Sequence, residues 1–153
     1  MRPFGNREVW GGFDPSRSGD NSTFVIVARP LHEGERFRVL AIYQWRGLNF
    51  SWPAEQIKQL MKRYNMTYLG IDTTGIGKSV YDLVTQFALR EANAILYSVE
   101  SKNRLVMKMI DVVERKRIEW AKDAQVPILP TRLSVITPLL ILSLAFILIA
   151  ITP

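Results

Sequence analysis

The stretch EVWGGFDPSRSGD, residues Glu8–Asp20, carries one carboxylate, Asp14, at the end of a short apolar segment. Its valine, tryptophan and phenylalanine are typical of a buried β-strand, and its adjacent glycines let another backbone come close. Pro15 ends the strand, and a polar turn follows. The β-branched and aromatic stretch Thr23–Arg29 predicts a second strand that pairs with the first as a hairpin. An acid at such a strand end is suited to hold a metal ion, although solvated loop aspartates are also common there.

The hydrophobic pattern downstream predicts three more strands and three helices. Alternating or continuous apolar runs mark the strands, and apolar residues spaced three and four apart mark the helices. The first three strands predict an antiparallel meander, and the later strand–helix–strand units predict parallel pairing with right-handed crossovers. The fold class is therefore α/β, a mixed sheet with helices on both faces. The expected strands are Arg36–Trp45, Met66–Asp72 and Ala94–Val99, and the expected helices are Ser51–Tyr64, Gly77–Arg90 and Asn103–Arg115.

The last of these helices has an apolar face and a basic face. The net charge of the chain is +6, and a basic surface suits a polyanion such as nucleic acid or an anionic membrane. A solubilising excess of positive charge is an equally good explanation. The apolar face is expected to bury Val106, Met109, Ile110 and Val113, and the basic face carries Lys102, Arg104, Lys108, Arg115 and Lys116.

The composition restricts the chemistry that a chain of 153 residues can perform. Cysteine is absent, which excludes disulfides and thiolate metal sites. The single histidine, His32, lies in an expected loop, so His-rich zinc sites and a Ser/His/Asp triad are not supported. Any metal ligands must be carboxylates, and oxygen ligands favour Mg²⁺, Mn²⁺ or Ca²⁺. Residues 1–12 are polar and broken by proline and glycine, so they do not resemble a signal peptide.

Asp14 and Asp72 share one context, because each closes an apolar strand and precedes a turn. If the two strands are parallel neighbours, the carboxylates lie side by side at one edge of the sheet. Like charges that close repel each other unless a cation lies between them. Two metal ions roughly 4 Å apart can activate a water and stabilise the leaving oxygen in phosphodiester cleavage. The alternative is a pair of unrelated loop acids.

Two apparent motifs fail when their spacing is checked. The run DTTGIGKS, residues 72–79, resembles a phosphate-binding P-loop, but Asp72 replaces its first glycine and would face the phosphates. A second metal-binding acid after an apolar strand is also missing. The segment that begins at Asp14 imitates an EF-hand loop, but its twelfth position is Val25 instead of the required glutamate.

Four segments, in order, resemble the C-terminal nuclease domain of phage terminase large subunits, and in particular those of P2-like tailed phages. The likeness covers about Val9 to Trp120. It implies a ribonuclease H-like fold and a metal-dependent endonuclease that uses Mg²⁺ or Mn²⁺ in a two-metal site. The implied substrate is concatemeric double-stranded DNA in the bacterial cytoplasm, and the implied partners are the terminase small subunit and the portal. The segments are WGGFDPSRSGDNSTFVIVA, YQWRGLNFSWPAEQIKQL, YLGIDTTGIGKSVYDLV and LYSVESKNRLVMKMIDVVERKRIEW.

The resemblance gives roles to individual residues. Asp14 matches the first catalytic acid and is expected to bridge the metals, and Asp72 matches the second acid and is expected to hold one of them. Lys102 lies in the Ser-Lys segment before the last expected helix, where it either contacts phosphate or is a solvated lysine. With Arg104 and Lys108 it forms the candidate DNA-binding set.

The chain departs from the family pattern in two places. The family carries an ATPase motor domain ahead of the nuclease, and nothing precedes Arg2 that matches it. The family also has a third catalytic aspartate in a His-Ala-Asp type segment, which this sequence lacks after about Trp120. We therefore expect weak or no cleavage, with Asp20, Glu119 and Asp123 as possible replacements. The alternative is a non-catalytic prophage remnant that binds DNA or associates with a membrane.

The C-terminal segment Leu133–Ile151 has no charged residue in 19 positions. A helix of this length spans roughly 28 Å, close to the hydrocarbon core of a bilayer. The expected organisation is an incomplete nuclease domain at 1–122 and, at 123–153, a linker with a hydrophobic helix that is a transmembrane candidate. The tail is either a frameshift product unrelated to the fold or a membrane anchor with Arg132 on the cytoplasmic side.

Overall fold

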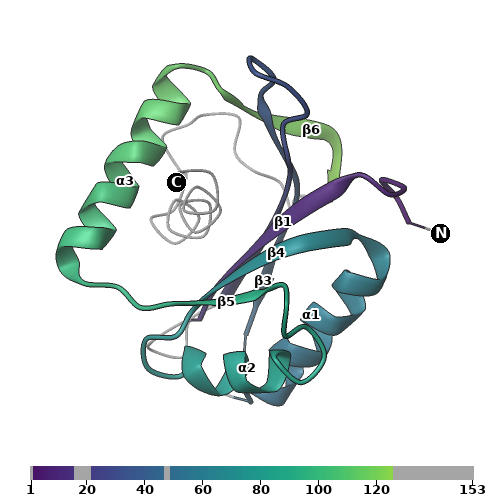
Figure 1. The fold of residues 1–153 in the computed structure, drawn as a ribbon, viewed down its shortest axis with the longest axis vertical. Helices are drawn as coiled ribbons and strands as arrows, with labels where there is room; N and C mark the ends of the chain where they lie inside the picture. Colours follow the sequence, from purple (N-terminus) through teal and green to yellow (C-terminus); the bar gives the residue numbers. More distant parts are fainter. Residues whose placement is uncertain (1, 16–21, 47–48, 126–153) are drawn as a thin grey trace.

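The computed structural model describes residues 2–15, 22–46 and 49–125, with side chains as far as Glu119. Within this part of the chain, six strands form one mixed sheet in the order β5-β4-β1-β2-β3-β6 (Figure 1). The strands are β1 (Glu8–Asp14), β2 (Ser22–Ala28), β3 (Phe37–Trp45), β4 (Asn65–Asp72), β5 (Ala92–Ile95) and β6 (Ile118–Gln125).

The strand directions confirm the expected topology. β1, β2 and β3 form the antiparallel meander, and β4 and β5 join it beside β1 in parallel. The last strand, β6, pairs in parallel with β3 at the other edge of the sheet and was not predicted. Its sequence, IEWAKDAQ, alternates charged and apolar residues over a short stretch, which does not separate a strand from a linker. The chain enters it through Lys116, whose φ of 55° breaks the preceding helix.

Helices cover both faces of the sheet, as expected. The helices α1 (Ser51–Arg63) and α2 (Gly77–Val84) lie together on one face, and α3 (Val99–Glu114) lies on the other (Figure 1). Phe13 and Ile71 belong to the core between the sheet and the first two helices. Val25 and Val27 point the other way, into a smaller core beneath α3.

Three element boundaries differ from the expectation. α2 ends at Val84 rather than Arg90, because the backbone N–H groups of Phe87 and Ala88 both donate to the Val84 carbonyl in a closing turn. β5 begins two residues earlier and ends four residues earlier than expected. α3 begins four residues earlier, because Ser98 caps it. The Ser98 side chain accepts a hydrogen bond from the Ser101 backbone N–H, and the Ser101 hydroxyl oxygen accepts one from the Ser98 backbone N–H.

The buried stripe of α3 was predicted wrongly. The buried residues are Leu105, Met109 and Val112, whereas Ile110 is 39% exposed. Both stripes have helical spacing and share the methionine, so periodicity alone did not choose between them. The observed stripe turns Arg104 and Lys108, which flank Leu105, toward the edge of the contact between helix and sheet.

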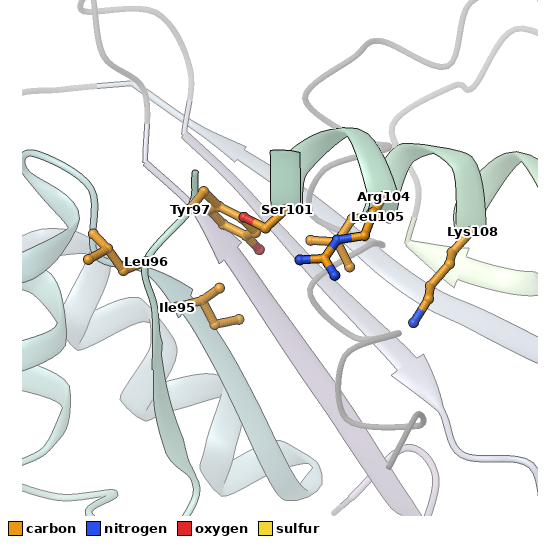
Figure 2. A pocket seen from close by; sticks show the side chains of 7 residues that line it. All are labelled: Ile95, Leu96, Tyr97, Ser101, Arg104, Leu105 and Lys108. Atoms are coloured by element: carbon orange, nitrogen blue, oxygen red, sulfur yellow. The ribbon is translucent and has the colours of Figure 1, made fainter. Parts of the chain in front are cut away.

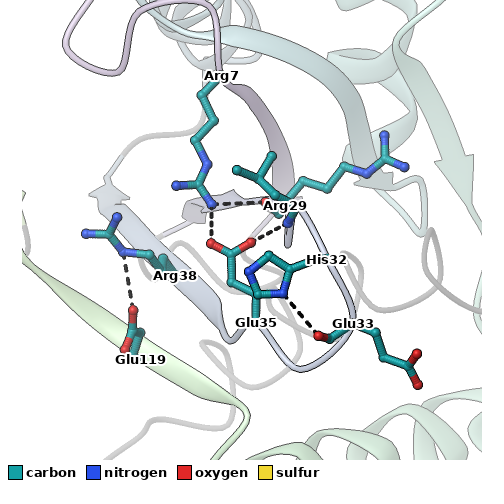
Figure 3. A network of polar contacts seen from close by, with 8 residues as sticks. Arg7, Arg29, His32, Glu33, Glu35, Arg38 and Glu119 are labelled. Atoms are coloured by element: carbon teal, nitrogen blue, oxygen red, sulfur yellow. Dashed lines mark hydrogen bonds and ion pairs between the residues drawn. The ribbon is translucent and has the colours of Figure 1, made fainter.

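Ion pairs connect the strands at one end of the sheet, which we call the ion-pair edge (Figure 3). Hydrogen bonds from the Leu31 backbone N–H and then from Arg7 hold the pKa of the Glu35 carboxyl below its ordinary value. The exposed His32 contacts the neighbouring Glu33 carbonyl, as expected for a loop residue. The pairs of the edge are Arg7–Glu35 at 2.9 Å, Arg29–Glu8 at 2.8 Å and Arg38–Glu119 at 3.4 Å.

Candidate active site at the ends of two parallel strands

Asp14 and Asp72 lie at the ends of two adjacent parallel strands. β1 and β4 pair in register with Phe13 beside Ile71, so the next residue on each strand is an acid. Neighbouring strands lie about 4.8 Å apart, and side chains alternate between the two faces. Because Phe13 and Ile71 point toward α1 and α2, both acids point to the α3 face. Asp14 is 6% exposed and Asp72 is 4% exposed. Two buried carboxylates therefore lie side by side, and their catalytic and metal-binding roles stay predictions.

Two threonines complete this end of the sheet, which we call the acid edge. Thr23 on β2 is the cross-strand partner of Asp14. The backbone N–H of Thr74 donates to Oδ1 of Asp72 at 2.8 Å, which fixes that carboxylate. The hydroxyls of both threonines are buried without a hydrogen-bond partner among the residues that the structure describes. Sequence reasoning missed Thr23, and only the register of the β1–β2 hairpin identifies it.

Two glycines of the β4–α2 turn are needed for different reasons, Gly77 for close packing and Gly75 for its backbone conformation. A Cβ on Gly77 would lie 1.7 Å from the Asp72 carbonyl oxygen and 2.9 Å from Cγ of Pro15. The start of α2 therefore packs directly against the ends of both acid-bearing strands, and only glycine fits there. Gly75 has a φ of 64°, a conformation that side chains other than glycine rarely adopt. Lys78, the lysine of the P-loop-like run, binds Asp82 at 2.6 Å on the exposed surface. The run thus serves as a tight turn.

A pocket of about 260 Å³ opens on the α3 face, between the end of β5 and the first turns of α3 (Figure 2). Tyr97 belongs to this pocket and also lies near the acid edge. The pKa of Tyr97 is raised, first by burial and then by the negative charges of Asp72 and Asp14. The cross-strand partner of Asp72 is Ile95, two residues before Tyr97, so the tyrosine follows directly on the acid edge. The pocket is lined by Ile95, Leu96, Tyr97, Ser101, Arg104, Leu105 and Lys108.

The candidate DNA-binding residues divide into two groups. Arg104 and Lys108 line the pocket and extend from α3 toward the sheet (Figure 2). Lys102 does not line it, and its ammonium nitrogen lies 5.5 Å from the centroid of the Tyr97 ring. This cation–π contact gives Lys102 a role in holding the tyrosine.

The proposed replacements for a third acid do not reach the acid edge where the structure describes them. Glu119 pairs with Arg38, which is level with Ala28 and Val9, five residues before Asp14 on β1. This is roughly 16 Å along the strand, at the ion-pair edge. The backbone of Asp123 precedes Gln125, which is level with Ala41 and also short of the acid edge.

No group of three or more acid or histidine side chains that could hold a metal occurs among the described residues. Asp20 lies outside the described residues. The acid edge nevertheless fits a divalent cation. Its donors are two buried carboxylates and two buried hydroxyls, all of them oxygen, which Mg²⁺ and Mn²⁺ prefer. Two like charges on adjacent strands also require a compensating positive charge.

The described residues contain no helix that is long and apolar enough to span a membrane. The apolar segment Leu133–Ile151, which the sequence marks as a membrane candidate, lies outside them.

Solved structures share this fold. The terminase nuclease domain of human cytomegalovirus, soaked with manganese and bound to an inhibitor, superimposes with a TM-score of 0.62 over 96% of this chain and 84% of that chain, at 12% identity. The large terminase nuclease of thermophilic phage G20c with bound magnesium gives a TM-score of 0.59 over 78% of this chain and 60% of that chain, at 17% identity. The fold is thus that of the ribonuclease H-like terminase nucleases.

Sequence relatives give the family. Residues 11–132 match the terminase RNase H-like domain, so the match continues past Trp120, where the resemblance in the sequence was expected to end. The chain belongs to this family. It is 53% identical to the probable terminase ATPase subunit of Haemophilus phage HP1 over 134 residues, which are 88% of this chain and 22% of that protein. It is 43% identical to the terminase ATPase subunit of Escherichia phage P2 over 122 residues, 80% of this chain and 20% of that protein. The chain thus spans about a fifth of the length of these relatives.

Proposed function

We propose that this chain is the nuclease part of a phage DNA-packaging terminase large subunit and cleaves concatemeric double-stranded DNA with Mg²⁺ or Mn²⁺. The observation that carries the proposal is the pair of buried carboxylates, Asp14 and Asp72, at the ends of adjacent parallel strands. Membership of the terminase RNase H-like domain family supports it, as do the relatives named as terminase subunits.

The residues of the acid edge have distinct roles in this proposal. Asp14 and Asp72 would hold the divalent ions, and the Thr74 backbone N–H keeps the Asp72 carboxylate oriented. The buried Thr23 hydroxyl lies beside Asp14, where it would hydrogen bond to a water or a phosphate oxygen. Divalent ions supply an activated water and neutralise charge on the phosphate when they are bound.

The cleavage is proposed to be weak. Glu119 lies at the ion-pair edge, and among the side chains that the structure describes two carboxylates, and no third, lie at the acid edge. A missing ligand lowers metal affinity and leaves one metal poorly held. The terminase small subunit and the portal are proposed as partners by family membership, and the bacterial cytoplasm as the location.

A plasmid-nicking assay of the full chain with Mg²⁺ or Mn²⁺ tests the proposal. We expect slow nicking that requires the metal and is lost in Asp14→Asn and Asp72→Asn. Asp82→Asn is the matched control, because this acid is exposed and paired with Lys78 on the opposite side of the β4–α2 turn. Robust nicking by Asp14→Asn would remove Asp14 from the site. The metal-induced shift in melting temperature of the same proteins gives a readout independent of cleavage.

A second candidate is a non-catalytic remnant that binds DNA. The two basic side chains of the pocket, Arg104 and Lys108, favour it, because they offer positive charge to a phosphate whether or not cleavage occurs. Binding that weakens with salt, without nicking under any metal, would support this candidate over the nuclease. The other form of the non-catalytic alternative is a remnant that associates with a membrane through Leu133–Ile151. Partition of the full chain, but not of residues 1–122, into a detergent phase would support it.

A further inference from the structure

The pocket beside the acid edge combines two kinds of surface. Arg104 and Lys108 supply positive charge from α3 (Figure 2). Ile95 at the end of β5 and the Tyr97 ring supply apolar surface, and Leu105 adds to it from α3. A site that binds only phosphate has no need of an apolar wall, because the phosphate is bound by charge and hydrogen bonds alone. The combination suits a ligand with an anionic end and an apolar, flat end.

The size of the pocket limits the ligand to about one nucleotide. A volume of about 260 Å³ is below the roughly 300–1,000 Å³ of sites for drug-sized ligands. A duplex keeps its bases stacked and paired, so it offers only phosphates to a surface pocket of this size. An unpaired nucleotide offers its phosphate and its base together, and proteins bind single strands with basic side chains and aromatic surfaces.

The position of Tyr97 connects the pocket to the acid edge. The tyrosine lines the pocket together with Ile95, and Ile95 is the cross-strand partner of Asp72. Lys102 lies over the Tyr97 ring and holds it in place. A nucleotide in the pocket would therefore be a neighbour of the phosphate at the acids.

We infer that this pocket binds one unpaired nucleotide of a DNA strand, with the phosphate at Arg104 and Lys108 and the base against Tyr97, Ile95 and Leu105. The inference deepens the proposed function and rests on it for the identity of the substrate. It makes a strand that is open near the cleavage site the preferred form of DNA.

Binding of labelled oligonucleotides to the full chain in EDTA tests the inference without cleavage. The probes are a single-stranded 12-nucleotide oligothymidine, an abasic strand of the same length and a blunt hairpin duplex. We expect the oligothymidine to bind about tenfold tighter than the abasic strand, because base contacts are lost in the latter. Equal binding of these two strands, or binding of the duplex as tight as that of the oligothymidine, would overturn the inference.

Two pairs of variants assign the effect to the pocket. Arg104→Gln should lower the affinity for both single strands about fivefold. It should also reduce the slope of log affinity against log salt concentration by about 0.7. Arg90→Gln is the control, because this arginine is exposed and lies outside the pocket. Tyr97→Ala should abolish the preference for bases over abasic strand, with Tyr81→Ala on α2 as its control. A preference that persists in Tyr97→Ala, in a protein that melts cooperatively, would overturn the assignment. Because this binding is measured in EDTA, where no metal-dependent cleavage occurs, its outcome is independent of the nicking assay, and a failed nuclease proposal and a failed pocket are told apart.

Discussion

The two ends of the sheet differ in how their charged side chains are arranged. At the ion-pair edge, every pair joins opposite charges, as in Arg7–Glu35 and Arg29–Glu8, and the side chains are partly exposed. At the acid edge, Asp14 and Asp72 carry the same charge, are almost fully buried and end neighbouring strands. The ion-pair edge is balanced by its own residues and stabilises the fold. A divalent ion at the acid edge would offset these two like charges, and buried acids of this kind are typical of functional sites.

The largest expected effect comes from disturbing the backbone at the acid edge. Gly77→Ala places a Cβ 1.7 Å from the Asp72 carbonyl oxygen, so α2 and the end of β4 must separate. We expect a loss of about 3 kcal/mol in the free energy of unfolding, together with loss of metal binding. Urea unfolding and Mn²⁺ titration measure the two effects. Gly34→Ala, at a position with a φ of 88° and nothing within 4 Å, measures backbone strain without a steric contact, and Gly77→Ala should cost more than it does. A Gly77→Ala protein with normal stability would show that the close approach is wrong.

A smaller effect of opposite sign is expected from removing one of the like charges. Asp72→Asn keeps the side-chain oxygen that accepts from the Thr74 backbone N–H but removes the repulsion with Asp14. In EDTA the variant should be more stable than the parent chain by about 1–2 kcal/mol. In Mn²⁺ the order should reverse, because only the parent binds the ion tightly. Thermal unfolding of the parent chain and of Asp72→Asn, in EDTA and in Mn²⁺, measures both differences. An Asp72→Asn protein that is less stable than the parent in EDTA would contradict the repulsion.

The smallest effect is expected at the ion-pair edge and depends on pH. The pKa of Glu35 is lowered in the folded state, mainly by the Leu31 backbone N–H and also by Arg7, so its stabilisation is complete above the ordinary value of 4.5. It is lost as the pH falls through the lowered folded value. The stability difference between the parent and Glu35→Gln should therefore shrink as the pH is lowered from about 6 to about 3. Urea unfolding at several pH values measures it, and a constant difference would mean that the carboxylate is not held by these donors.

The sequence predicted the part of the site that depends on strand order. Asp14 and Asp72 each follow an apolar run, so the sequence predicted that they meet if their strands are parallel neighbours, and the β1–β4 pairing meets that condition. Thr23 did not follow, because it depends on the exact register of the hairpin. The two buried hydroxyls became visible only once neighbouring strands were aligned.

The sequence did not predict the pocket, and the reason lies in α3. Met109 fits two apolar stripes, and only packing against Val25 and Val27 selects the one with Leu105 and Val112. That rotation turns Arg104 and Lys108 into the pocket. The start of the helix was also missed, because the capping pair at its start uses serine in place of the usual Glu or Gln at the third position.

The most direct test of the account is Mn²⁺ binding to the full chain, measured by titration calorimetry. The account predicts binding to the parent chain and to Asp82→Asn, and loss of at least tenfold in affinity in both Asp14→Asn and Asp72→Asn. Undetectable binding to the parent chain, or affinity that is unchanged when either buried aspartate is replaced, would contradict a cation site at the acid edge.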